Sequence, residues 1–308
     1  MGDRGRELAR KSYGRVELAD RALAVLEEAA EGRAPHRGRR AVWWGVAATA
    51  ALLALAFAPT FRTLWRTWLH NDNYSHGLLI PLVSGFLLWR HRRALRASVG
   101  RPSAWGLPVL AAGLLALVAG TRADFTMVQG YSFVIVLLGL VLHFFGRATA
   151  RQALFPVAYL IFMSPLPPVL ANDISFRLKA WVVNFSTAAA RWMGIAVARE
   201  GMTLHLPTGA VAIENPCSGL RSLVAVLALA TLLAYFARRG GMVRRVALVL
   251  SAVPIALAAN WVRITLIVLA ANYVSVAFAT GAMHDISGYV LFGVDVIGLL
   301  LVRAALRC

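Results

Sequence analysis

Long apolar runs separated by short polar stretches dominate the pattern of hydrophobic and polar positions along the chain. Because a helix needs roughly 20 apolar residues to span a bilayer, these runs predict membrane-spanning helices. The run 77–89 is short and predicts a tilted or partly re-entrant helix, and Pro254 predicts a kink in the seventh run. The eight runs cover residues 41–59, 77–89, 104–120, 126–145, 153–170, 217–237, 243–270 and 285–303.

Two longer polar segments interrupt this pattern. Residues 1–40 form a basic head, in which Val16–Ala30 has helical periodicity and is either an amphipathic helix on lipid headgroups or part of a disordered tail. The segment 171–216 precedes the sixth run. We therefore divide the chain into a head, 1–40, and a transmembrane domain, 41–308.

The segment 171–216 itself has two parts with different periods. Asn172–Gly194 places apolar residues at helical spacing and predicts an amphipathic helix at the membrane interface. Gly201–Ile213 alternates apolar and polar residues and predicts a small hairpin turning at Pro207–Gly209. This hairpin leads directly toward Cys217, where it would shield a thiol from water or hold an extended peptide as an added strand.

Composition agrees with a membrane protein. Hydrophobic residues make up 59% of the 308 residues and charged residues 15%, whereas soluble domains average about 45–50% and about 25%. The fold class predicted is an all-α polytopic membrane protein of about eight spans. The two cysteines give no disulfide framework, and the polar first 40 residues do not resemble a cleavable signal peptide.

The formal net charge of +18 raises the question of nucleic-acid binding, which the placement of the charges answers. With the head inside and the spans alternating, inside segments hold 23 of the 32 Lys and Arg residues and outside segments hold seven. This is the positive-inside pattern. It predicts that both termini are cytoplasmic and that the lipid bilayer, not nucleic acid, is the partner of the basic charge.

A polar stretch centred on Cys217 opens the sixth run, at the predicted outer face. A Pro-Cys-Ser-Gly turn at a helix start places the thiol near free N–H groups and the positive end of the helix dipole, which favour a thiolate. Arg221 follows four residues later, on the same helix face. The alternative is a small buried thiol beside a helix cap. Glu214 and Asp285 are two carboxylates that could orient the imidazole of His284, the histidine discussed next.

Two further candidate site residues, Arg263 and His284, lie on other predicted spans and also near the predicted outer face. Arg263 lies within an apolar span, where a charge costs roughly 2.5–3.5 kcal/mol on insertion scales and so indicates function; the alternatives are an ion pair with Asp295 or a snorkelling side chain. Asn260, one turn earlier, would bind a substrate backbone or orient Arg263. His284 opens the eighth run; a lone histidine at the interface is more often structural, but beside a candidate nucleophile it is suited to general acid/base catalysis.

A second polar cluster, Asn71–Gly77, precedes the short second run on the same predicted side. Its Ser75 and His76 either bind substrate or cap the helix that follows. The sequence favours neither interpretation.

Several stretches together resemble the exosortase/archaeosortase family of membrane-embedded cysteine transpeptidases. They are Asn-Tyr-Ser-His-Gly-Leu-Leu-Ile-Pro-Leu at 73–82, Phe-Met-Ser-Pro-Leu-Pro at 162–167, Asn-Pro-Cys-Ser-Gly-Leu-Arg-Ser-Leu at 215–223, Asn-Trp-Val-Arg-Ile at 260–264 and His-Asp-Ile-Ser-Gly-Tyr-Val-Leu-Phe at 284–292. The resemblance covers roughly residues 41–305, and His284 resembles the bacterial exosortase form.

The resemblance implies a catalytic set of Cys217, Arg263 and His284 in a bacterial inner membrane. It implies substrates that are membrane-anchored proteins with a C-terminal signal: a short motif, one span and a basic tail. Bacterial members are associated with exopolysaccharide export. We expect neither a cofactor nor a metal ion, and the sequence leaves the oligomeric state open.

Three other functions remain compatible with the sequence. A transporter or channel subunit would line a polar pathway with Arg263 and Asp295, and a non-catalytic component of a polysaccharide-export assembly would tolerate loss of Cys217. A plain membrane protease would differ from a transpeptidase only in the acceptor.

Overall fold

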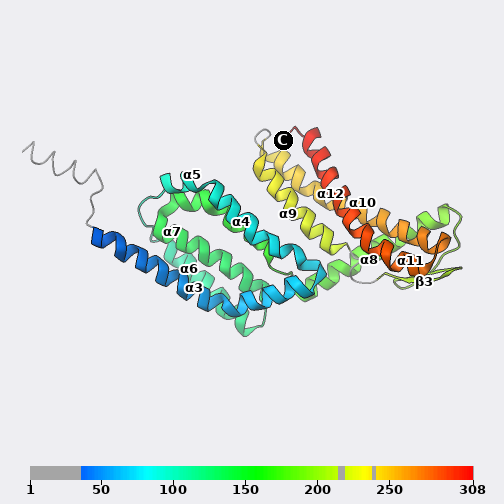
Figure 1. Ribbon diagram of the computed structural model, residues 1–308, viewed down its shortest axis with the longest axis horizontal. Helices are drawn as coiled ribbons and strands as arrows, with labels where there is room; N and C mark the ends of the chain where they lie inside the picture. Colours follow the sequence, from blue (N-terminus) through cyan, green and yellow to red (C-terminus); the bar gives the residue numbers. More distant parts are fainter. Residues whose placement is uncertain (1–35, 214–218, 238–240, 308) are drawn as a thin grey trace, which may run out of the picture. The chain divides into compact units, whose positions relative to one another are not determined.

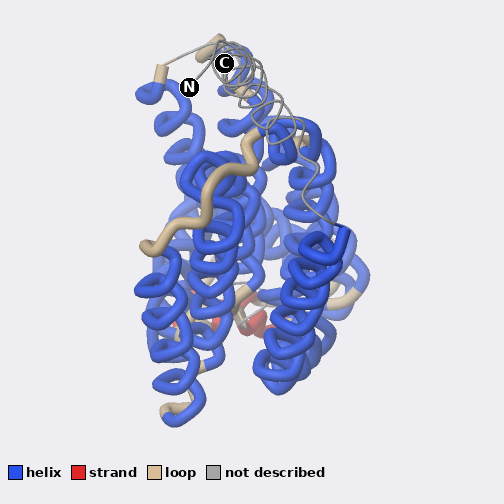
Figure 2. Tube along the Cα trace, turned by 90° about the vertical axis from the view of Figure 1, so that its left-hand side faces the viewer, coloured by secondary structure: helices blue, strands red, loops and turns tan. Residues whose placement is uncertain are grey.

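The structure, a computed structural model, describes residues 36–213, 219–237 and 241–307. The chain divides into two compact units, residues 1–59 and 60–308. Helices make up nearly all of the described chain, and the strands form one small patch (Figure 2). The helix predicted over Val16–Ala30 lies outside the described residues.

Helix α3 (His36–His70) begins in the first unit and ends in the second. After it the chain forms a 3-10 helix and a series of short and long α-helices (Figure 1). The short second run thus becomes a helix of only 12 residues, α4. The elements up to the second long helix are η1 (Asp72–Leu78), α4 (Leu79–Arg90), α5 (Arg92–Ala97), α6 (Gly106–Arg122) and α7 (Thr126–Tyr159).

Helix α6 packs closely along the first part of α7. Three buried glycines, seven residues apart on one face of α6, lie against the backbone or side chains of α7, and a Cβ at any of them would come into conflict with that helix. Small residues of this kind let two membrane helices approach closely. The glycines are Gly106, Gly113 and Gly120.

The chain of α7 doubles back at Gly146. This residue has φ +83° and ψ 177°, outside the helical region, and so breaks α7 into two arms. Gly130 on the first arm lies against Ser164, just beyond the second. One straight helix of 34 residues would hold its ends about 50 Å apart. The two arms are therefore antiparallel and correspond to the separately predicted runs 126–145 and 153–170.

The predicted hairpin is present and is part of a larger sheet. The second arm of α7 continues into η2 (Leu160–Met163), and the predicted amphipathic helix is α8 (Pro168–Trp192). Three strands follow in antiparallel order β1-β2-β3. They are β1 (Ala198–Glu200), β2 (Thr203–Leu206) and β3 (Gly209–Ala212). Strand β1 was not predicted.

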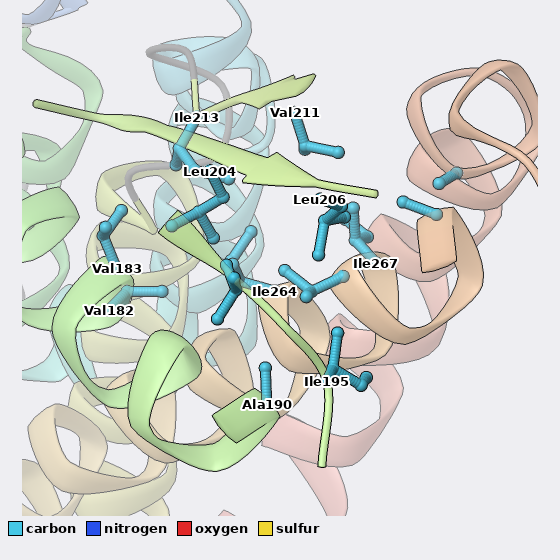
Figure 3. Close-up of a cluster of buried hydrophobic side chains, with 14 residues drawn as sticks. Val182, Val183, Ala190, Ile195, Leu204, Leu206, Val211, Ile213, Ile264 and Ile267 are labelled. Carbon is cyan, nitrogen blue, oxygen red and sulfur yellow. The ribbon is translucent and has the colours of Figure 1, made fainter. Parts of the chain in front are cut away.

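One face of this sheet is buried on helices. Leu204, Leu206, Val211 and Ile213 point into a cluster with Ile264 of α10 (Figure 3). Residues of α8 and of α11 (Val276–Thr280) complete the cluster. The alternation of apolar residues in Gly201–Ile213 is thus explained by burial on one side only.

The last three long helices contact one another pairwise. They are α9 (Leu220–Phe236), α10 (Met242–Tyr273) and α12 (Ala282–Ala305). Helix α10 runs through Pro254 as one element and ends at Tyr273.

Within the described residues, four helical stretches are long and apolar enough to cross a membrane, and helices α6 and α9 are apolar but shorter. These helices support a multi-pass, mainly helical membrane protein; the number of eight spans stays a prediction. The stretches are Ala48–His70, Thr126–Met163, Met242–Tyr273 and Ile286–Ala305.

Candidate functional site

The start of α9 is held against α10 by a glycine. Gly219 is the N-cap of α9 and has φ +79°, a left-handed conformation that other residues rarely adopt. A Cβ built on it would lie 2.8 Å from Nδ2 of Asn260. The position therefore requires glycine both for its conformation and for the close approach to Asn260.

This contact fixes the end of the segment that carries the candidate nucleophile. Cys217 and Glu214 lie outside the described residues, but Cys217 is only two residues before Gly219 in the sequence. The glycine of the Cys-Ser-Gly motif is thus placed next to the asparagine of the Asn-Trp-Val-Arg motif. Two of the sequence motifs meet here.

Arg263 connects α10 to α12. It lies three residues after the buried Asn260 and so on the same side of α10. Its Nε donates a hydrogen bond to Oγ of Ser287 at 3.0 Å. Gly288 lies beside it; a Cβ on that glycine would be 3.8 Å from Nη2 of Arg263. The guanidinium of this half-buried arginine is therefore held at the α10–α12 contact.

The same contact brings α10 close to the position of His284. His284 is the third residue of α12, and Ser287 follows it by three residues, about 4.5 Å along the helix axis. The side chains of His284 and Asp285 lie outside the described part of the structure. Ser287 was not singled out as a site residue from the sequence; its spacing of three residues from His284 was the signal that could have placed it near the site.

Asp295 does not pair with Arg263 in the described structure. Its side chain is completely buried in α12, and neither carboxylate oxygen has a hydrogen-bond partner among the described residues. The interpretation of Arg263 as an ion-pair partner of Asp295 is thus not supported.

In the second polar cluster, two side chains stabilise the local turn. Oδ1 of Asn71 accepts a hydrogen bond from the N–H of Asn73 at 3.1 Å, and Oγ of Ser75 donates to the carbonyl of Asp72 at 3.3 Å. Asn71 is the N-cap of η1. Ser75 thus bonds within η1 and does not cap α4, whose N-cap is Leu78 without a side-chain hydrogen bond.

His76 lies in a different environment. Element η1 contacts α9, and both ring nitrogens of His76 are enclosed, with no hydrogen-bond partner among the described residues. Burial and the nearby guanidinium of Arg221 lower the pKa of the imidazole from 6.5 to about 4, and the carbonyl of Phe162 acts in the opposite direction. The structure thus brings together His76 and Arg221, which the sequence analysis treated separately.

Trp68 supports this part of the fold, and the sequence analysis missed it. Its Nε1 donates a hydrogen bond to the carbonyl of Met163 at 2.9 Å, and Gly77 lies so close to the indole that a Cβ would collide with it. Burial raises the pKa of the neighbouring Tyr74. Trp68 lies between the first two apolar runs, and a single tryptophan there gives no sequence signal for such a contact.

The described residues contain no group of three or more His, Cys, Asp or Glu side chains placed to hold a metal ion. The polar side chains brought together are instead an arginine, a serine and an asparagine. Such groups donate hydrogen bonds to carbonyl oxygens or anions.

Comparison with known proteins gives one family. Residues 65–301 match the family described as transmembrane exosortase. No curated protein and no solved structure matches the chain. The match begins in α3, ends in α12 and includes every motif discussed above. The chain belongs to the transmembrane exosortase family.

Proposed function

We propose that this chain is a membrane cysteine transpeptidase or protease that uses Cys217, Arg263 and His284 to cleave C-terminal sorting signals. The observation that carries the proposal is the pair of contacts Gly219–Asn260 and Arg263–Ser287. The first lies two residues after Cys217, and the second lies one helical turn after His284. Membership of the exosortase family supports the reaction class.

The nucleophile in this proposal is the thiolate of Cys217. It attacks the carbonyl carbon of the scissile peptide bond and forms a tetrahedral oxyanion. Collapse of this intermediate breaks the C–N bond, releases the C-terminal span and tail as an amine, and leaves the remainder of the substrate as a thioester on Cys217. An amine acceptor or water then attacks the thioester and restores the thiol.

Arg263 supplies positive charge to the oxyanion in this scheme. A guanidinium held in place by Ser287 stabilises the developing charge better than a mobile one, because no reorganisation is needed during the reaction. Removing one such donor typically lowers the rate about 10²–10³-fold. Asn260 is proposed to position the substrate backbone, and Arg221 to support the anionic site.

His284 is proposed as the proton carrier. It donates a proton to the leaving amine and later removes one from the incoming acceptor. Asp285 and Glu214 are the candidate carboxylates to orient it. No step requires a cofactor.

We place this site on the outer face of a bacterial inner membrane, with both termini in the cytoplasm. The placement rests on the distribution of Lys and Arg along the chain. The proposed substrates are exported proteins whose C-terminus carries a motif, one membrane span and a basic tail.

The test is processing of a tagged reporter that ends in such a signal, co-expressed with wild type, Cys217→Ala or Cys217→Ser. Cys308→Ser is the matched control, because Cys308 is the other of the two cysteines. We expect both Cys217 variants to abolish processing at normal membrane levels and the control to retain it. Hydroxylamine added to wild type should release the reporter as a hydroxamate, which reports the thioester.

Retained processing in Cys217→Ala would remove this function. A transporter or a non-catalytic export component would then be the function to pursue, because neither depends on a thiol.

A further inference from the structure

The three-stranded sheet has an unpaired edge that points away from β2. The N–H of Ile213 donates to the carbonyl of Met202 at 3.0 Å, so Ile213 faces β2. In an antiparallel strand the direction of the backbone groups alternates, so Val211, opposite Leu204, faces β2 as well. Ala210 and Ala212 therefore direct their N–H and C=O groups away from the sheet.

The two residues that carry these backbone groups lie at the protein surface. Ala210 and Ala212 are both exposed, and within the described residues their backbone groups make no hydrogen bond beyond the strand. The intervening Val211 is buried against the helices, which anchors the strand. The edge thus presents two donors and two acceptors on a fixed backbone.

The opposite edge of the sheet is protected and this one is not. Strand β1 ends in Arg199 and Glu200, both exposed and charged. Charged side chains on an edge strand prevent the pairing of another strand. Strand β3 has only Gly209, Ala210, Val211 and Ala212, with no charge and no proline. Its small exposed residues leave room for a neighbouring chain.

We propose that the outer edge of β3 binds the substrate peptide beside the scissile bond as a fourth, extended strand. This proposal rests on the proposed function. The occupant is an extended peptide because an open row of backbone donors and acceptors recognises another backbone, largely independent of its side chains.

The position of β3 in the chain explains why the substrate is the occupant. Ala212 precedes Cys217 by five residues, and five residues span at most about 18 Å. Cys217 therefore lies within about 18 Å of the end of β3, wherever residues 214–218 run. A peptide that pairs with β3 and continues past Ala212 for four or five residues, at roughly 3.3 Å per residue, is long enough to reach it.

Proline substitutions test the edge with little effect on the fold. Proline removes one N–H, and it is tolerated on an edge strand when that N–H faces outward. We expect Ala210→Pro or Ala212→Pro to lower kcat/KM for the tagged reporter roughly three- to tenfold, as for the loss of one hydrogen bond. Arg199→Pro is the matched control, because Arg199 faces outward on β1, opposite Leu204.

Equal losses in Arg199→Pro and the β3 variants would show a general effect on the sheet and overturn the proposal. The two proposals fail separately. If Cys217→Ala abolishes processing while both β3 proline variants process normally, only the edge proposal is wrong. If Cys217→Ala still processes the reporter, the proposed function fails, and the edge proposal fails with it.

Disulfide trapping measures directly which residues of the substrate peptide lie opposite β3. The protein carries Cys217→Ala, Cys308→Ser and Ala210→Cys, and the reporter carries one cysteine at successive positions before its span. We expect cross-links at every second position, because side chains of an added strand alternate between two faces. Cross-links without this period, or none, would overturn the proposal. So would a disulfide-linked homodimer of the Ala210→Cys protein as the sole product, since β3 would then pair with a second copy.

Discussion

Arg263 donates a hydrogen bond from Nε to Oγ of Ser287 at 3.0 Å, and this bond joins α10 to α12 beside the position of His284. A long arginine side chain has many rotamers, and fixing it before substrate binds lowers the entropic cost of catalysis. Ser287 is therefore a positioning residue in the proposed mechanism, since it acts through Arg263.

We expect Ser287→Ala to lower kcat roughly 10–100-fold, because a hydrogen bond to a charged group contributes about 1.5–3 kcal/mol. KM should change little if the arginine acts mainly in the transition state. The measurement is the steady-state rate of reporter cleavage in membranes. Ser251→Ala is the matched control, because Oγ of Ser251 donates to the carbonyl of Leu248 in its own helix. Equal effects of both variants would contradict the positioning role.

The second prediction concerns Gly219. Gly219→Ala should lower the free energy of unfolding by about 2–4 kcal/mol. An alanine there must adopt a left-handed φ, which costs about 1–2 kcal/mol. Its methyl group would also clash with the side chain of Asn260. Gly194→Ala is the control: Gly194 has φ +82°, and no neighbouring atom would lie within 4 Å of an added methyl group. Thermal unfolding in detergent should show the smaller loss for Gly194→Ala. Similar losses would mean that the contact with Asn260 contributes nothing.

The third prediction is a pH dependence of stability due to His76. Its folded-state pKa is about 4, below the usual 6.5. Between these values the unfolded chain binds a proton that the folded chain excludes, so stability is full above pH 6.5 and falls as the pH drops toward 4. The slope approaches about 1.4 kcal/mol per pH unit.

Thermal unfolding at pH 7.5, 6 and 5 measures this effect. The variant His76→Gln should lose part of the dependence that wild type shows. The exposed His70, at the end of α3, provides the matched His→Gln control. An unchanged slope in His76→Gln would assign the pH dependence to other groups.

The fourth prediction compares two buried polar side chains. Asp295 has no hydrogen-bond partner among the described residues, whereas Gln129 accepts from Oγ1 of Thr60 at 3.1 Å and donates to the carbonyl of Gly120 at 3.2 Å. An unsatisfied buried polar group costs about 1–3 kcal/mol. Asp295→Ala should therefore be neutral or stabilising, and Gln129→Ala destabilising, in the same unfolding assay. A marked loss of stability in Asp295→Ala would reveal a partner for this carboxylate.

Sequence patterns predicted the elements well where a single period dominates. The amphipathic helix Asn172–Gly194 corresponds to α8, and the alternation in Gly201–Ile213 corresponds to β2 and β3. Strand β1 was missed because Ala198–Glu200 is exposed throughout and so carries no alternation. Short α11 was missed because five residues are too few to establish a period.

Contacts between elements were harder to predict, for a physical reason. Periodicity shows which face of a helix is buried but not which helix covers it. The sequence therefore placed Arg263 and His284 near the outer face without predicting the bond from Arg263 to Ser287. It also gave no sign that His76 lies near Arg221. Of the proposed catalytic set, Cys217 and the side chain of His284 lie outside the described residues and remain predictions.

If each arm of α7 crosses the membrane, as the separate runs 126–145 and 153–170 predict, the reversal of the chain at Gly146 adds one crossing to the topology. Because the two arms of α7 are antiparallel, every helix after Gly146 runs in the opposite sense to the one it would have if the arms formed a single rod. The region where α9, α10 and α12 meet around Asn260, Arg263 and Ser287 would then open on the other side in the predicted topology. In the predicted topology, one residue outside the site thus sets the side of the membrane on which the proposed site opens.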